Sequence, residues 1–180
     1  MSINETKQQI LNTCNELLKK KSFDDLTVQE IAKNSGLSRH TFYNHFEDKY
    51  YLIIWAYEQD VLECLRKITP EYTWRMAMQH SFRNIKNSNV PYSKLVKNNL
   101  VRIKAFDATR TVYEQLLKQN HVLLDDTLKF QIEFFCRSAV EMIGVWVSSG
   151  YRKNEMALYK NLCTCLPNEL KDTLISNHLY

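Results

Sequence analysis

The chain has 180 residues and a formal net charge of +4, from 24 Lys and Arg against 20 Asp and Glu. Three glycines and three prolines supply too little turn chemistry for a sheet protein with many tight turns. We therefore expect an all-α fold, long enough to bury a core without disulfides or a structural metal.

The cysteines and the N-terminal segment bear on the compartment. Five cysteines are scattered among apolar helical positions with no C-x-x-C pair, which is typical of core residues in a reducing environment. Cys163 and Cys165, with His178, come nearest to a metal site, but the two thiols are expected on different faces of one helix. No signal peptide is recognisable, and no run approaches the ~20 apolar residues of a membrane span. We expect a cytoplasmic protein with no membrane partner, metal or cofactor.

The first part of the chain has the pattern of three helices. Apolar residues at helical spacing predict an amphipathic helix over residues 4–21. A capping box at Thr27 starts a second helix, Gly36 ends it, and Ser38 caps a short third one. Two short helices joined by a glycine turn form a helix-turn-helix, and we assign residues 1–50 to this domain.

The remaining residues, 51–180, are predicted to form a helical bundle that binds an effector and dimerises. Asp48 can cap a long helix that ends at about residue 68 and links the two domains. Further helices are predicted over residues 74–86, 92–106, 108–119, 125–150 and 156–166.

The segment GLSRHTFYNHFEDK, residues 36–49, has the composition of a helix that reads DNA. The second helix of a helix-turn-helix lies in the major groove, with its first residues against base edges. Phe42 and Phe46 can anchor this helix. Residues 37–46 contain no acidic side chain that would repel phosphate. Arg39 can read a guanine edge and Asn44 an adenine edge, although the sequence does not fix which base each meets.

The stretch TVQEIAKNSGLSRHTFYNHFEDKYYL resembles the TetR-family signature T-x-x-x-I-A-x-x-x-G-[VL]-S-x-x-x-F-Y-x-H-F-x-x-K-x-x-L, and the resemblance extends over about residues 7–55. It implies a three-helix DNA-binding head, a connecting fourth helix, a ligand-binding body and dimerisation through the last two long helices. The resemblance also implies that Thr27 and Lys49 contact phosphates of the DNA, and that Tyr43 and His45 contact the DNA backbone. The predicted DNA-binding residues are Thr27, Ser38, Arg39, His40, Thr41, Tyr43, Asn44, His45 and Lys49.

A second, shorter resemblance lies in the C-terminal half. Phe134 together with Gly144-x-Trp146-x-x-x-Gly150 is similar to the pattern of TetR relatives that regulate dihydroxyacetone-kinase operons. It implies the architecture of that subfamily rather than a particular effector.

Two groups of apolar residues are candidates for the body's functions. Aromatic residues at helical spacing are usually core, but apolar cavities between helices are the usual ligand sites of bundles. The predicted effector pocket consists of Tyr57, Phe82, Ile103, Phe106, Tyr113, Phe130 and Phe134. A seam spaced by 4, 3, 4, 3 and 4 residues is typical of a helix packed along a partner. The predicted dimer interface consists of this seam and the last helix: Leu128, Ile132, Phe135, Ala139, Met142, Trp146, Leu158, Leu162 and Leu166.

Residues 66–110 carry ten Lys and Arg against Glu71 and Asp107, a local charge of +8. We favour a position near DNA for these cations, where they would add a non-specific attraction. The alternatives are an anionic effector held by two or three of them, or an ordinary solvated face.

We therefore predict a homodimeric transcription regulator that binds a palindromic, double-stranded operator under the control of an unidentified small-molecule effector. No nucleophile with its base, carboxylate pair, phosphate loop or metal motif appears, so an enzyme is not expected. The alternative is a helical ligand-binding or coactivator-like protein that has lost operator binding. The intact DNA-binding residues argue against it, namely Arg39, Tyr43, His45 and Lys49.

Overall fold

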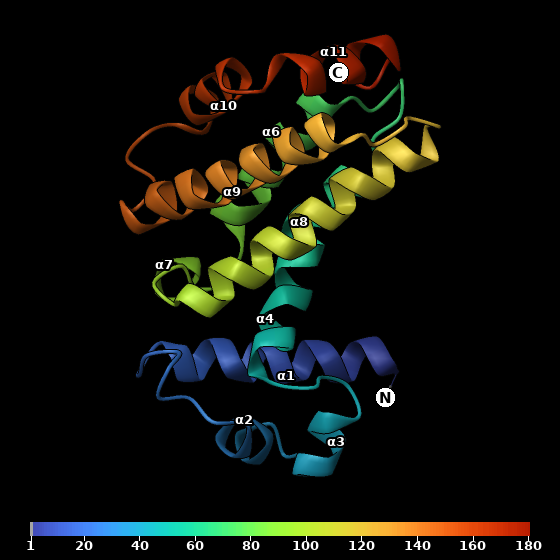
Figure 1. The fold of residues 1–180 in the computed structure, drawn as a ribbon. Helices are drawn as coiled ribbons and strands as arrows, with labels where there is room; N and C mark the ends of the chain where they lie inside the picture. Colours follow the sequence, from blue (N-terminus) through green and yellow to red (C-terminus); the bar gives the residue numbers. More distant parts are fainter. Residues whose placement is uncertain (1) are drawn as a thin grey trace.

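A computed structural model describes residues 2–180, which form helices and no β-strand. A small head of α1 to α3 lies at one end and a larger body of α6 to α11 at the other, joined by the helix that begins with α4 (Figure 1). The predicted all-α class, with an N-terminal helix-turn-helix and a helical body, is confirmed. The helical segments are α1 (Ile3–Leu18), α2 (Val28–Asn34), α3 (Arg39–Tyr43), α4 (Lys49–Tyr57), the π-helical turn η1 (Glu58–Leu62), α5 (Glu63–Arg66), α6 (Trp74–Asn87), α7 (Tyr92–Leu95), α8 (Asn99–Gln119), α9 (Asp126–Ser148), α10 (Glu155–Thr164) and α11 (Asn168–Ser176).

Side-chain caps set the starts of the head helices. The Thr27 hydroxyl accepts the Glu30 N–H, and the Glu30 carboxylate accepts the Thr27 N–H, which completes the predicted capping box of α2. The Ser38 hydroxyl accepts the Thr41 N–H and caps α3. Between them Gly36 has a φ of +68°, a conformation that residues with a Cβ rarely adopt. The predicted helix-turn-helix therefore has the local geometry that its sequence requires.

The predicted connecting helix forms one continuous run of α4, η1 and α5. A π turn widens an α-helix locally and disturbs its regular backbone hydrogen bonding. Here the Asp60 carbonyl accepts a hydrogen bond from Asn84 Nδ2 at 3.0 Å, and the Val61 carbonyl accepts one from Ser81 Oγ at 3.3 Å. Both donors belong to α6, so the wide turn is also the place where α6 is fastened to the connecting helix.

The structure corrects the prediction of one helix over residues 92–106 and another over 108–119. α7 ends after one turn, and the side chain of Asn98 accepts the Val101 N–H to start α8, which then runs without a break through Asp107. Asp107 is tolerated there because its carboxylate is exposed and lies 3.9 Å from Arg110. A further helix, α11, lies beyond the predicted elements, because a proline ends one helix and can also begin the next, and Pro167 precedes the first residue of α11.

The C-terminal residues close the body. The Trp74 backbone N–H donates to the Leu179 carbonyl at 2.6 Å, and the Tyr180 ring stacks on the Trp74 ring with centroids 5.6 Å apart. The Trp74 indole donates to the Tyr113 hydroxyl at 2.6 Å. Trp74 therefore joins α6, α8 and the C-terminal end in one core.

We predict opposite effects for alanine at two glycines. Gly36→Ala should lower the free energy of unfolding by about 1–2 kcal/mol, because a Cβ is strained at this positive φ although no atom lies within 4 Å. Gly144→Ala should be neutral or raise it by up to about 1 kcal/mol, since alanine is the better helix former. Its Cβ would lie 3.8 Å from Val96 Cβ, an ordinary contact. Urea unfolding of both variants measures the difference, and equal effects would contradict the assignment of strain to Gly36.

Candidate nucleic-acid interface and ligand cavity

The short helix α3 lies at the end of the head farthest from the body (Figure 1). Phe42 and Phe46 are buried beneath it, and the Phe46 ring lies 5.9 Å from that of Trp55 on α4. These contacts hold a helix too short to be stable alone, as the sequence predicted.

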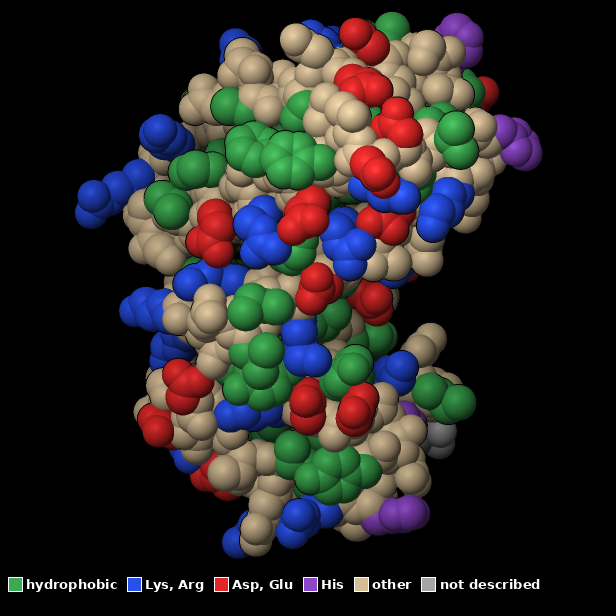
Figure 2. Space-filling model, viewed as in Figure 1, with side chains coloured by type: hydrophobic (Ala, Val, Ile, Leu, Met, Phe, Trp, Pro, Cys, Tyr) green, Lys and Arg blue, Asp and Glu red, His purple; other side chains and the backbone are tan. Residues whose placement is uncertain are grey.

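The predicted reading residues lie together on the outer side of α3. Arg39, His40, Tyr43 and Asn44 are exposed, and Thr41 and His45 are half-buried. Within the described residues, Arg39 and His40 have no side-chain hydrogen bond or ion pair, so their donors face solvent. Lys, Arg and His side chains are visible at this tip of the molecule in Figure 2. This surface is thus rich in hydrogen-bond donors, and Arg39 and His40 on it have no partner among the described residues.

Thr27 lies at the start of α2, and its hydroxyl is engaged within the head. It donates to Glu30 Oε2 at 3.0 Å and accepts the Glu30 N–H. The hydrogen bond from Lys21, followed by those from Thr27, lowers the pKa of Glu30 and keeps its carboxylate charged. The phosphate contact predicted for Thr27 stays a prediction, and it requires the hydroxyl to leave Glu30.

Lys49 is engaged within the head, and its predicted phosphate contact stays a prediction. Its Nζ donates to the carbonyls of Phe23, Asp24 and Leu26 at 2.8, 3.1 and 2.8 Å. An ammonium group has three donors, so all of them are used. Nζ also lies 4.8 Å from the centroid of the Phe23 ring, and burial lowers the Lys49 pKa. Lys49 therefore fastens the loop between α1 and α2 to the start of α4.

The head is held against the body by side chains for which the sequence predicted no such contact. Lys94 Nζ donates to the Leu18 carbonyl at the end of α1, and Asn98 Nδ2 donates to Asp24 Oδ1 in the next loop. Lys104 Nζ lies 4.3 Å from the centroid of the Tyr51 ring. The sequence predicted a helix through residues 96–98 and therefore no turn there. Asn98, which caps the start of α8, was the signal that could have revealed the turn.

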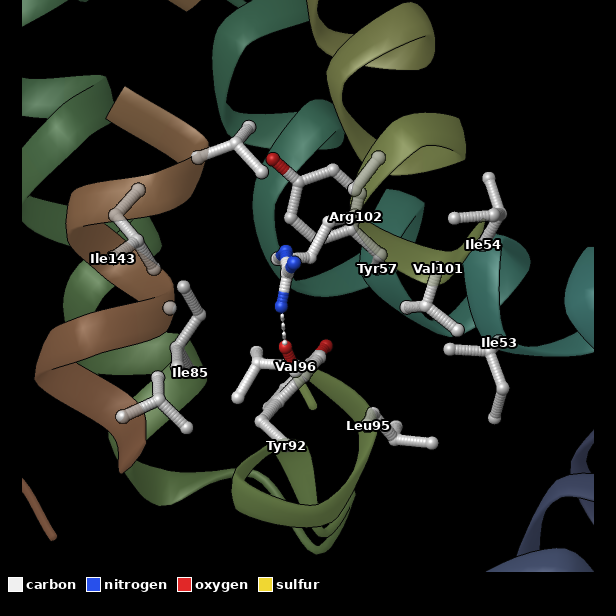
Figure 3. A pocket seen from close by; sticks show the side chains of 14 residues that line it. Ile53, Ile54, Tyr57, Ile85, Tyr92, Leu95, Val96, Val101, Arg102 and Ile143 are labelled. Carbon is white, nitrogen blue, oxygen red and sulfur yellow. Dashed lines mark hydrogen bonds between the residues drawn. The ribbon is translucent and has the colours of Figure 1, made fainter. Parts of the chain in front are cut away.

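A small cavity of about 50 Å³ lies just above this junction (Figure 3). Its walls come from α4, α6, α7, α8 and α9, and they are mainly aliphatic. Arg102 is the one side chain with a full charge among the described residues that line it. The lining residues are Ile53, Ile54, Tyr57, Ile85, Tyr92, Leu95, Val96, Val101, Arg102, Ala105, Val140, Ile143, Gly144 and Val147.

The seven residues predicted for the effector pocket do not surround one cavity, and only Tyr57 lines this one. Tyr57, Phe82 and Tyr113 line a second cavity of about 20 Å³, which has room for little more than one water. Ile103, Phe130 and Phe134 point outward, with 41%, 68% and 55% of their surface exposed. Phe106 is buried, with the Arg137 guanidinium 4.1 Å from its ring centroid. Helical spacing identified the apolar residues of these helices, but it did not show which of them other helices of the body cover.

An open apolar groove of about 500 Å³ runs between α9 and α10. Six of the nine residues predicted for the dimer interface line it: Phe135, Ala139, Met142, Trp146, Leu158 and Leu162. Met142 is exposed, but the other eight are buried within the chain. The predicted seam of α9 therefore packs mainly on its own body. The outward face consists of Phe130, Phe134, Met142 and Val145, which also recur at helical spacing.

The cations of residues 66–110 do not form one basic patch. Arg66 pairs with Glu58 and Glu63, Lys86 with Glu155, and Arg110 with Glu114. Side chains of both signs alternate across the body in Figure 2. This arrangement favours a solvated face for most of the local charge of +8 over a position against DNA.

No group of three or more His, Cys, Asp and Glu side chains in residues 2–180 is arranged to hold a metal ion. None of the helices in that range is both long enough and apolar enough to cross a membrane.

Comparison with known proteins identifies the head. Residues 10–54 match the family described as bacterial regulatory proteins, tetR family. The HTH-type dhaKLM operon transcriptional activator DhaS of Lactococcus lactis subsp. lactis (strain IL1403) is 23% identical over 90 residues, 50% of this chain and 48% of that protein. The uncharacterized HTH-type transcriptional regulator YerO of Bacillus subtilis (strain 168) is 43% identical over 56 residues, 31% of this chain and 19% of that protein. The matched segments thus span less than half of each curated relative.

The likeness in fold extends to the body. The solved structure of a dihydroxyacetone kinase operon activator DhaS superposes with a TM-score of 0.62 at 17% identity, covering 93% of this chain and 97% of that one. The sequence pattern around Trp146 predicted this architecture. The helix-turn-helix of this chain thus matches the tetR family of bacterial regulatory proteins over residues 10–54, and the chain shares its fold with the solved DhaS structure.

Proposed function

We propose that the chain is a transcription regulator that binds a palindromic operator as a homodimer, under the control of a small molecule bound in the body. The observation that carries this proposal is the outer side of α3, where Arg39, His40, Tyr43 and Asn44 are exposed and their backbone is anchored by Phe42. An anchored helix with unpaired donors can enter a major groove without first breaking internal contacts.

The open groove between α9 and α10 supports a dimer. Phe134, Met142 and Val145 are exposed along it, and a contiguous apolar surface on a protein in water usually marks an interaction site. A second copy related by a two-fold axis would cover this groove with the same groove. Two heads arranged by that axis fit two half-sites of a palindrome.

The cavity beside the head supports control by a small molecule. Val96 lines the cavity, while Lys94 and Asn98 on either side of it bond to the head. A ligand that prefers another position of this turn shifts the head away from its DNA-binding position, and DNA then lowers the affinity for ligand by the same factor. The alternative function is a helical ligand-binding protein without operator binding. The operator-selection experiment in the next paragraph distinguishes it from the proposed function.

We predict that Arg39→Gln and Tyr43→Ala weaken binding to an operator selected from a random duplex pool. Arg39→Gln should cost about tenfold to a hundredfold and relax the preference at one base position, as loss of a base contact does. Tyr43→Ala should weaken binding to all sequences alike. Lys160→Gln removes the same charge from exposed α10 and should leave binding nearly unchanged. If the wild type selects no sequence, the alternative function is correct.

Lys49→Met should act on the stability of the head rather than on DNA contacts. The free energy of unfolding should fall by about 1.5–3 kcal/mol, because carbonyls of the loop lose a charged donor. Amide hydrogen exchange should rise at residues 23–26 while the body stays protected. Lys33→Met, on exposed α2, should change stability by less than about 0.5 kcal/mol. Unchanged stability with lost DNA binding would return Lys49 to the phosphate role.

Phe134→Glu combined with Val145→Glu should convert a dimer into a monomer near 21.4 kDa, because two charges would be buried without partners in the groove. Gln115→Glu, on exposed α8, should leave the dimer intact. Light scattering at micromolar concentration measures the mass. A wild-type protein that is already monomeric under these conditions contradicts the dimer.

A further inference from the structure

The cavity beside the head combines aliphatic walls with a single guanidinium. Figure 3 shows the Arg102 side chain extending from α8 into the space between Tyr57, Val96 and Ile143. The hydroxyl groups of the two lining tyrosines are already paired, Tyr57 with Thr109 Oγ1 at 2.8 Å and Tyr92 with Asp60 Oδ2 at 2.7 Å. Arg102 is therefore the lining side chain with donors to offer a ligand.

Arg102 is only partly satisfied in the structure. Nη1 donates to the Val96 carbonyl at 2.8 Å and Nη2 to Asn99 Oδ1 at 3.3 Å. Nε is buried, and its N–H has no acceptor. Glu141 Oε1 lies 3.0 Å from Nε, but the N–H does not point at it, so the contact is an ion pair without a hydrogen bond. A guanidinium has five donors, and a buried donor without a partner is unfavourable.

We propose that this cavity binds a short-chain monocarboxylate, with the carboxylate on Arg102 and the alkyl chain against Ile85, Ile143 and Val147. The proposal rests on the proposed function and names the chemistry of its effector. A carboxylate offers two acceptors to a guanidinium and forms charge-assisted hydrogen bonds. The volume of about 50 Å³ is roughly four times the space that one water needs, which suits an alkyl chain of a few carbons.

Glu141 does not line the cavity, but its carboxylate pairs with the same guanidinium and would compete with the ligand's carboxylate for it. Its side chain is 53% exposed, so it can turn into solvent when an anion arrives. Arg102 also holds the Val96 carbonyl, which lies in the turn between Lys94 and Asn98. A ligand that draws the guanidinium away from Val96 therefore loosens the turn whose neighbours bond to Leu18 and Asp24 of the head.

The full-length protein is titrated with butyrate, butyramide and butylamine, which have similar size and different charge. Calorimetry should show butyrate binding at least about tenfold more tightly than butyramide, since a charged acceptor strengthens the hydrogen bonds of a guanidinium. Butylamine should not bind, because its ammonium group would face Arg102. Equal binding of butyrate and butyramide, or binding of none of the three, would overturn the proposal.

Two variants assign the binding to this site. Glu141→Gln should tighten butyrate binding severalfold, because a competing carboxylate is removed from an exposed position without disturbing the fold. Arg102→Gln should abolish the preference for butyrate over butyramide. Lys118→Gln, which removes a cation at the exposed end of α8, should change neither. Weaker butyrate binding in Glu141→Gln, or an unchanged preference in Arg102→Gln, would place the anion elsewhere and overturn the proposal.

Operator binding is measured separately, without any carboxylate. Selective butyrate binding by a protein that selects no operator would contradict the proposed function and leave the ligand class standing. Operator binding by a protein that ignores all three compounds would contradict the ligand class alone. Where both are present, butyrate should weaken or strengthen operator binding by the same factor by which operator changes butyrate binding.

Discussion

Backbone carbonyls at helix ends, loops and turns require donors, and side chains from distant elements supply them throughout this molecule. Lys49 donates to the loop after α1, Lys94 to the last turn of α1, and Arg102 to the turn before α8. Asn84 and Ser81 do the same at the wide turn of the connecting helix. Each of these hydrogen bonds joins two segments that belong to different helices or loops. Together with apolar packing, these few donors therefore determine how the helices are held to one another.

The cations among these donors show why charge along the chain is a poor guide to function. Lys49 and Lys94 are basic residues of or near the head, yet their donors face inward, whereas Arg39 projects outward from α3. An ammonium group that holds carbonyls is not available to phosphate unless that structure opens. The DNA-binding surface that we propose is therefore narrower than the basic residues of the sequence suggest, and it is concentrated on α3. Lys94 and Arg102, which bond to carbonyls beside the cavity, lie where they can affect the position of the head.

The sequence predicted the head well because its information is local. Thr27, Gly36 and Ser38 each act on the residues next to them, and a cap or a positive φ can be recognised from a few neighbouring letters. The body was predicted less well because its decisive contacts join residues far apart in the chain. The apolar seam of α9 could be read from its spacing, but whether the seam or the neighbouring line of Phe130 and Phe134 faces the core depends on where α6 and α10 lie. The partial pairing of Arg102 likewise follows from a turn that periodicity does not reveal.

The wide turn at Glu58–Leu62 has a geometric meaning for the chain as a whole. A π turn is equivalent to one residue inserted into an α-helix, and each residue of such a helix advances the chain by about 100° and ~1.5 Å. A deletion within this turn that restored regular winding would leave head and body individually intact but rotate one against the other by about a quarter of a turn. Lys94 and Asn98 would then no longer face Leu18 and Asp24. The rotation of the head relative to the body is thus set by the number of residues in one short segment of the connecting helix.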